Sequence, residues 1–220
     1  MLEFSAPQLL HARAASIRAV REGEKNAYSR ACNALRRVAD AVGCPFALVG
    51  GLAAIHYGAQ VTALEIEIAV ARNRLETVLA ECEKQGFVLL RRDHDGWHSL
   101  TYQDPEGNVQ IQIIPEGAKY PRDPPHAPAN PGPRALGVEH GLGYSSFGGW
   151  VAMKLVANRR KDQYHLVEVL KLATEQQIAE AVQQLRPMHP SYLKAFDDLL
   201  REAAEENEQE TLRRRHNHAP

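Results

Sequence analysis

The segment that most restricts the fold is Phe46–Val49, an apolar run that follows Pro45 and stops at Gly50-Gly51. Such a run, bounded by proline and by paired glycines, is typical of a buried strand that turns sharply into the next element. The residues that follow, Leu52–Tyr57, predict a short helix there. The chain must therefore combine strands with helices.

The hydrophobic period changes twice along the chain. Helical spacing begins near Ser5 and Pro7, and alternation of Glu65–Val70 then predicts a half-buried strand. Beyond Gly149 the spacing is helical again. The order predicts an α+β fold, with α/β as the alternative: a small mixed sheet flanked by helices, with N-terminal helices and a helical C-terminal half. The other expected elements are helices at Glu24–Ala41, Arg74–Gln85, Trp150–Asn158, Lys161–Ala173, Thr174–Leu185 and from Tyr192 to about Glu208, and strands at Phe87–Leu90, His98–Tyr102 and Asn108–Ile114.

The chain divides by composition into four expected regions. These are an N-terminal helical segment (1–44), an α/β core (45–145), a C-terminal helical bundle (146–208) and a flexible tail (209–220). Within the core, residues 115–133 hold seven of the thirteen prolines. Proline excludes regular helix and sheet interior, so this segment is expected to be a mobile loop or a lid packed over a site.

Composition is that of an ordinary globular protein, with 44% hydrophobic and 24% charged residues among 220. A net charge of −1 gives no global reason for tight binding to nucleic acid. Its three cysteines form no C-x-x-C pair, which argues against a zinc ribbon or a disulfide framework. No apolar run is long enough to span a membrane, and a cytoplasmic location is expected.

Gly50 and Gly51 lie where the strand meets the helix. Glycine lets backbone approach a ligand closely, and the start of a helix offers free N–H groups to phosphate. A tight turn that needs a positive φ explains the same pair without any ligand. Both interpretations stay open.

Glu65 and Glu67 share one face of the expected strand, with Cα atoms about 6.6–7 Å apart. Thr62 shortly precedes them. Carboxylates so placed can converge on hard divalent cations, which prefer oxygen ligands. A solvated strand face is the simpler alternative.

A basic corner connects two of the C-terminal helices. Lys154 lies near the end of one helix, and Arg159, Arg160 and Lys161 lie at the start of the next, followed by Asp162. Such a group can neutralise phosphates. Exposed basic residues at a helix–helix corner are the alternative.

Together these segments resemble the nucleotidyltransferase fold, and within it the small bacterial nucleotidyltransferases of the abortive-infection type II toxin group. The resemblance covers about residues 46–170. It rests on a strand ending in Gly-Gly, a short helix, a threonine before an acid-x-acid strand, and a K-x-x-A-x-x-x-R/K-D corner. Such enzymes hold two magnesium ions with three carboxylates and transfer a nucleoside monophosphate from an NTP to a hydroxyl.

The resemblance also implies roles for individual residues. Magnesium would be bound by Glu65 and Glu67, Lys154 and Lys161 would stabilise phosphate charge, and Asp162 would orient Lys161 or the acceptor. The implied partners are a nucleotide and either an RNA acceptor or an antitoxin-like protein. The implied nucleotide-binding residues are Gly50, Gly51, Thr62 and Lys154, and the implied catalytic residues are Glu65, Glu67, Gln112, Lys154, Lys161 and Asp162.

The sequence departs from the family pattern at the acidic positions. The usual Asp-x-Asp is replaced by Glu65-x-Glu67, and the third acid is matched by Gln112, which is neutral. The arginine that usually precedes the threonine is also absent. Three interpretations remain: an active magnesium-dependent transferase, a catalytically decayed module that binds a nucleotide or a protein, and a structural protein that dimerises through its helical half.

Overall fold

A computed structural model describes residues 15–92, 97–119 and 123–217. The helix expected to begin at Ser5 and Pro7 starts outside these residues. What is described of it is a turn at 15–17 that continues as the π-helix η1 (Arg18–Glu22). The other helical elements are α2 (Ala27–Val42), α3 (Gly50–His56), η2 (Arg72–Arg74), α4 (Leu75–Lys84), η3 (Arg134–Leu136), α5 (Phe147–Ala157), α6 (Arg160–Leu170), α7 (Glu175–Leu185) and α8 (Pro190–Asn217).

Six strands form one mixed sheet in the order β3-β4-β5-β2-β1-β6. The central strand β2 is parallel to β5 and antiparallel to β1, while β3, β4 and β5 form an antiparallel meander. This arrangement confirms the predicted α+β class with a small mixed sheet flanked by helices. The strands are β1 (Phe46–Val49), β2 (Glu65–Val70), β3 (Phe87–Arg92), β4 (His98–Tyr102), β5 (Val109–Pro115) and β6 (Leu142–Tyr144).

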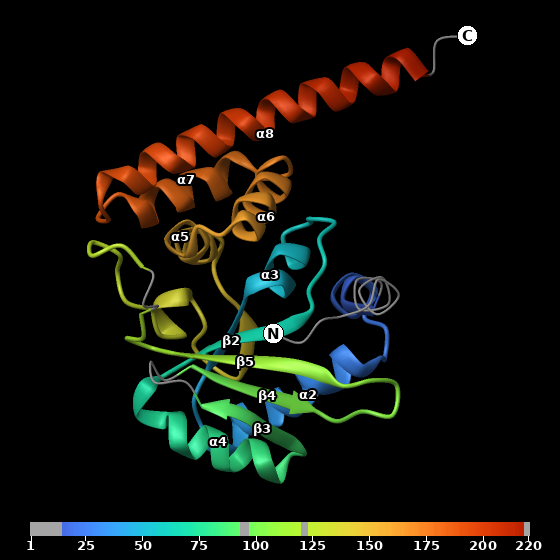
Figure 1. Ribbon diagram of the computed structural model, residues 1–220, viewed down its shortest axis with the longest axis vertical. Helices are drawn as coiled ribbons and strands as arrows, with labels where there is room; N and C mark the ends of the chain where they lie inside the picture. Colours follow the sequence, from blue (N-terminus) through green and yellow to red (C-terminus); the bar gives the residue numbers. More distant parts are fainter. Residues whose placement is uncertain (1–14, 93–96, 120–122, 218–220) are drawn as a thin grey trace.

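The two faces of the sheet are covered differently. Helices α2 and α4 pack against one face, and the main core forms there around residues such as Phe46, Ile66, Ile68 and Ile111 (Figure 1). On the opposite face the apolar residues of β1, β2 and β5 form a smaller cluster with Leu136 and Val138 of the η3 region. Because side chains alternate along β2, Glu65 and Glu67 belong to this second face.

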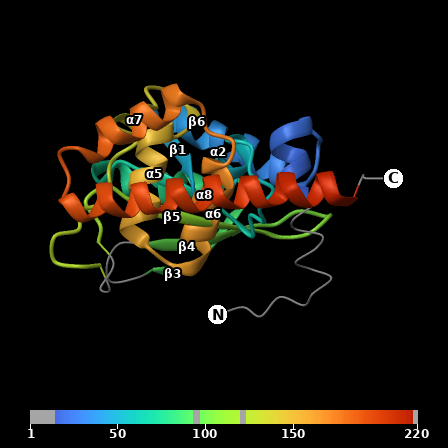
Figure 2. The ribbon, with the colours of Figure 1, turned by 90° about the horizontal axis from the view of Figure 1, so that it is seen from above.

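Helices α5 to α8 form a layer beyond α3 and the adjoining edge of the sheet (Figure 1). Seen from above, α8 runs across the molecule over this layer (Figure 2). Contacts tie α5 to α7 and α6 to α8, so the helical C-terminal half packs as a unit. None of the described helices combines the length and the apolar character that crossing a membrane requires.

The expected end of the last helix near Glu208 is wrong, because α8 continues to Asn217, into the region 209–220 that was expected to be a flexible tail. Its later turns are rich in strong helix formers, and Lys171 ties them to α6 through ion pairs with Glu206 at 2.6 Å and Glu210 at 3.0 Å. The helix therefore extends through residues that carry no apolar period.

Candidate functional site

The Gly-Gly turn between β1 and α3 is the centre of the candidate site. Gly50 has a φ of +64°, a conformation that glycine adopts readily and other residues do not. Its carbonyl oxygen accepts a hydrogen bond of 3.0 Å from the buried indole Nε1 of Trp150, which fixes α5 against the turn. Gly51 packs against Ala63, in the segment that holds the half-buried Thr62.

The Glu67 carboxylate lies directly over Gly50. A Cβ added to Gly50 would lie 1.5 Å from Glu67 Oε2 and 3.0 Å from Glu67 Cβ. The close approach explains the glycine in a way that the sequence could not, because the two residues are brought together only by the pairing of β1 with β2.

We expect Gly50→Ala to destabilise the protein more than Gly43→Ala does. Gly43 ends α2 with a φ of +67° and has nothing within 4 Å of an added Cβ, so it is matched in backbone conformation. Both substitutions should cost about 1–2 kcal/mol for the left-handed backbone. Gly50→Ala should cost a further 1–3 kcal/mol, roughly, for displacing the Glu67 carboxylate. Urea unfolding measures the free energy of unfolding of both variants. Equal decreases would show that the contact with Glu67 does not contribute to the cost of Gly50→Ala.

The two predicted metal ligands lie side by side on β2 in different environments. Glu65 is partly exposed, and its Oε1 lies 3.5 Å from the Lys161 ammonium at the start of α6. Burial, and secondarily the charge of Glu67, raises the pKa of Glu65, while Lys161 opposes this shift. Glu67 is only 6% exposed, and the described part of the chain provides no hydrogen bond or ion pair to it. Glu67 lines a hollow, into which a carboxylate that has no donor of its own can accept a hydrogen bond or a cation.

Gln112 occupies the strand position that the sequence predicted. It pairs in register with Glu67 across β2 and β5, and its Oε1 accepts a hydrogen bond of 3.0 Å from Ser99 Oγ. An amide here offers one oxygen and no charge. Among the described residues, no group of three or more His, Cys, Asp or Glu side chains is placed to hold a metal ion.

The basic corner between α5 and α6 is built around Asp162, which is fully buried. Its carboxylate accepts hydrogen bonds from Lys154 Nζ at 2.6 Å and from Arg159 Nε at 2.5 Å. Burial alone would raise the pKa of Asp162, but the hydrogen bonds from Arg159 and the charge of Lys154 outweigh it and lower the pKa. The expectation that Asp162 orients Lys161 is therefore wrong: Asp162 holds Lys154 and Arg159, and Lys161 pairs with Glu65.

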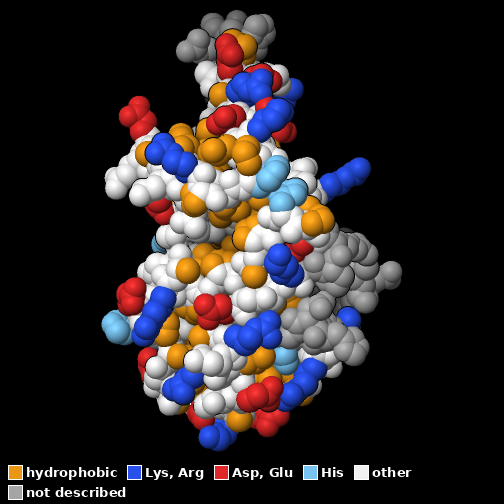
Figure 3. All heavy atoms as spheres, turned by 90° about the vertical axis from the view of Figure 1, so that its left-hand side faces the viewer, with side chains coloured by type: hydrophobic (Ala, Val, Ile, Leu, Met, Phe, Trp, Pro, Cys, Tyr) orange, Lys and Arg blue, Asp and Glu red, His pale blue; other side chains and the backbone are white. Residues whose placement is uncertain are grey.

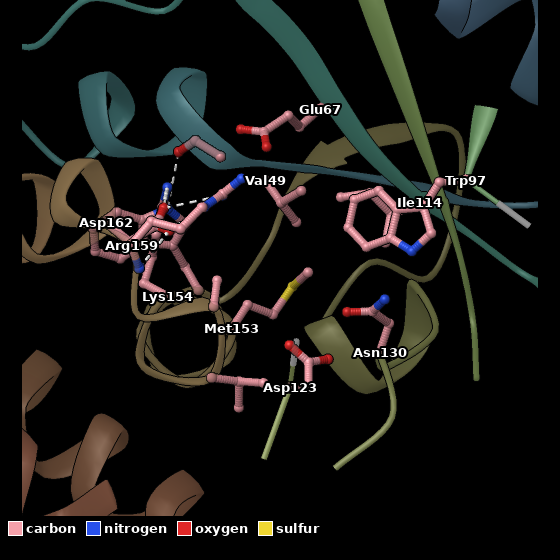
Figure 4. A pocket seen from close by; sticks show the side chains of 14 residues that line it. Val49, Glu67, Trp97, Ile114, Asp123, Asn130, Met153, Lys154, Arg159 and Asp162 are labelled. Atoms are coloured by element: carbon pink, nitrogen blue, oxygen red, sulfur yellow. Dashed lines mark hydrogen bonds and ion pairs between the residues drawn. The ribbon is translucent and has the colours of Figure 1, made fainter. Parts of the chain in front are cut away.

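Four of the predicted residues line one hollow, of about 40 Å³. These are Gly50, Glu67, Lys154 and Asp162, with Arg159 beside them, while Trp97, Ile114 and Met153 form an apolar wall (Figure 4). A volume near 40 Å³ is far below the roughly 300–1,000 Å³ of a pocket for a large ligand. This hollow is therefore too small to enclose a molecule of the size of a nucleotide.

His165 on α6 is a site residue that the sequence interpretation missed. It is 8% exposed, and its Nδ1 has no hydrogen-bond partner in the part of the chain that the structure describes. Burial, followed by the charge of Lys154, lowers the pKa of His165 to about 4. Its helical spacing from Lys161, four residues earlier, was the one available signal that it faces the same side.

We expect His165 to make the protein sensitive to acid. The imidazole has an ordinary pKa of 6.5 in the unfolded chain and about 4 in the folded protein, so the unfolded state takes up the proton first as the pH falls. The stability that depends on neutral His165 is complete above about pH 6.5 and is lost toward pH 4. His165→Gln should reduce the change in unfolding free energy between pH 7 and 4.5 by up to about 3 kcal/mol. Unchanged pH dependence would contradict this assignment.

Comparison with known proteins finds similar solved structures but no related sequence. No protein-family model and no curated protein sequence matches the chain. A solution structure of the antibiotic-resistance factor ANT(2'')-Ia is similar with a TM-score of 0.42 and 12% identity, over 87% of this chain and 98% of that chain. A crystal structure of ANT(2'')-Ia in complex with adenylyl-2''-tobramycin is similar with a TM-score of 0.40 and 13% identity, over 77% of this chain and 94% of that chain. TM-scores and identities this low carry no argument about function, so the functional assignment depends on the geometry of the site.

Proposed function

We propose that the protein is a nucleotidyltransferase that acts at the start of the central strand β2, which carries Glu65 and Glu67. It would bind an NTP with Mg²⁺ and transfer the nucleoside monophosphate to a hydroxyl acceptor. The observation that carries this proposal is the buried Glu67 carboxylate, which lies against Gly50 without a donor and shares a strand face with Glu65.

The donor set fits one magnesium ion better than two. Magnesium in proteins is usually held by one or two carboxylates together with substrate phosphates. Glu65 and Glu67 would supply those carboxylates, and Gln112 could add a neutral oxygen. When bound, magnesium would neutralise phosphate charge and polarise the α-phosphate.

The basic residues of the α5–α6 corner lie beside this end of β2. Lys161, about half exposed and 3.5 Å from Glu65, would contact the phosphates of the nucleotide. Asp162 fixes the α5–α6 corner through Lys154 and Arg159, which places Lys161 at the first turn of α6. In the reaction, the acceptor oxygen bonds to the α-phosphorus, the bond to the β-phosphate oxygen breaks, pyrophosphate leaves, and the hydroxyl proton is lost to solvent.

A catalytically decayed module is the second candidate, and Gln112 is the observation that favours it. With a neutral residue at the third position, the site lacks the charge to hold a second cation. Such a protein would keep the fold and bind a nucleotide or a protein partner without turnover.

Calorimetric titration of ATP, CTP, GTP and UTP, with and without Mg²⁺, separates these functions. Magnesium-dependent binding of any one supports the proposed site, and passage of the label from an α-labelled NTP to an acceptor, with release of unlabelled pyrophosphate, would support transfer. Binding indifferent to magnesium would instead support the decayed module. If none binds, the proposed transferase is wrong, and the decayed module remains only as a protein that binds a protein partner.

A further inference from the structure

The hollow beside Glu67 adjoins a second hollow. This second hollow, of about 150 Å³, shares Asn130, Met153 and Val156 with the first and runs between the proline-rich segment, α5 and the end of α7. On the face shown in Figure 3 the molecule narrows between the sheet and the C-terminal helices, and hydrophobic side chains gather there. Because they share these lining residues, the two hollows adjoin, and together (the path, below) they reach from this narrow region to Glu67 on β2.

The lining of the second hollow is apolar and adaptable. Three prolines, two methionines, a valine and two alanines make up most of it, and its polar side chains are the amides of Asn130 and Gln184. Methionine side chains are flexible and adjust to ligands of irregular shape. The described lining includes no lysine or arginine. A polyanion such as RNA, which binds through cationic contacts to phosphates, is therefore a poor match.

The amide of Asn130 points to a ligand with a polar group. Its Nδ2 is buried and has no hydrogen-bond partner among the described residues, although the backbone of Asn130 is held by Gly117 and Ala118. A buried donor without a partner costs about 1–3 kcal/mol. An oxygen atom on a bound molecule would satisfy it. In Figure 4 Asn130 and Asp123 lie on the side of the hollow away from Lys154, and Met153 lies between them and Lys154.

We propose that this path binds the acceptor, and that the acceptor is a small hydroxylated molecule with an apolar body of about the size of an aromatic ring. The inference rests on the proposed transfer function and names the class of its acceptor. An apolar cavity of about 150 Å³ accommodates a group the size of benzene. The apolar body would lie among Met153, Val156 and Met188, with an oxygen at Asn130 and the reacting hydroxyl toward Glu67.

Methionine-methyl NMR tests this with benzyl alcohol as the probe. Two of the three methionines of the chain, Met153 and Met188, line the hollow, so ¹³C-methyl labelling reports on it directly. Met153→Leu and Met188→Leu assign the signals. We expect both signals to shift saturably with benzyl alcohol and to be unaffected by single-stranded RNA. Val156 is half-buried in the wall of the hollow. Val156→Phe should therefore raise the Kd for benzyl alcohol at least about tenfold.

Val88→Phe is the matched control, because Val88 is 42% exposed on β3 and lies outside the hollow. Val88→Phe should leave the titration with benzyl alcohol unchanged. If Val156→Phe fails to fold, Ala152→Phe fills the hollow from a second position. The proposal would be overturned if benzyl alcohol caused no methyl shifts, or if Val156→Phe and Val88→Phe bound it equally well. It would also be overturned if RNA alone caused the methyl shifts. Calorimetric nucleotide binding is read separately: methyl shifts without nucleotide binding would overturn the acceptor role, whereas magnesium-dependent nucleotide binding without methyl shifts would overturn only this inference.

Discussion

Substitution of Glu67 by glutamine is expected to abolish magnesium-dependent nucleotide binding while the fold stays intact. The carboxylate is buried over Gly50 and receives no hydrogen bond or ion pair from the described residues, so its negative charge stabilises little in the metal-free protein. Glutamine keeps the shape and removes the charge that would hold the cation. We expect nucleotide affinity in the presence of Mg²⁺ to fall at least about 100-fold, as for loss of a direct metal ligand.

The same variant should be as stable as the wild type, or more stable, in the absence of metal. Removing a buried charge without partners relieves its desolvation penalty. Glu83→Gln, an exposed glutamate on α4, serves as the control for the loss of one charge. Thermal unfolding with and without Mg²⁺ and calorimetry with the bound NTP provide both measurements. A Glu67→Gln protein that unfolds more easily in the absence of metal, or that binds Mg·NTP as the wild type does, would contradict a metal-binding role.

The strands of the site were predictable because their signals are local. Alternation in Glu65–Val70 gave the bounds of β2 as the structure has them, and the run 108–114 predicted the strand β5, whose register with β2 places Gln112 beside Glu67. The helices expected at Glu24–Ala41 and Thr174–Leu185 begin within about three residues of α2 and α7, whose first turns are capped by Asn26 and Thr174. In each case neighbouring residues alone determine the periodicity or the cap.

Short and charge-dependent elements could not be predicted in this way. The strand β6 has three residues with Gly143 in the middle, too few for a period, and it forms because β1 offers an edge for parallel pairing. The part of α8 around Glu206 and Glu210 is held by Lys171, which lies more than thirty residues earlier in the chain. Neither partner is visible from the residues of the element itself.

The functional arrangement was less predictable than the elements that carry it. The residues of the acidic strand and the basic corner were identified by type and spacing, but their pairing was not. The ion pairs Lys161–Glu65 and Lys154–Asp162 form because α5 and α6 pack close to the Gly-Gly turn. His165 was overlooked because one histidine in a helix has no local feature that reveals its burial.

The largest effect on stability is expected for Asp162→Leu. Asp162 is fully buried, and its removal leaves the Lys154 ammonium, also buried, without a counter-charge. Breaking one side of a buried ion pair costs about 3–5 kcal/mol. Arg159 is partly exposed and can turn toward water, so most of the loss should come from Lys154. Urea unfolding of the single variant measures this loss.

The double variant Lys154→Met with Asp162→Leu should recover most of that stability, because two apolar side chains replace the pair without leaving a buried charge. The resulting cycle gives the coupling energy, and strictly additive losses would show that the two residues do not act as a pair. The double variant also decides what Lys154 does. If it folds and binds Mg·NTP as the wild type does, Lys154 positions the α5–α6 corner. If stability recovers but nucleotide affinity stays low, the ammonium contacts the nucleotide, as the sequence pattern predicted, and its contact with Asp162 belongs to the nucleotide-free state.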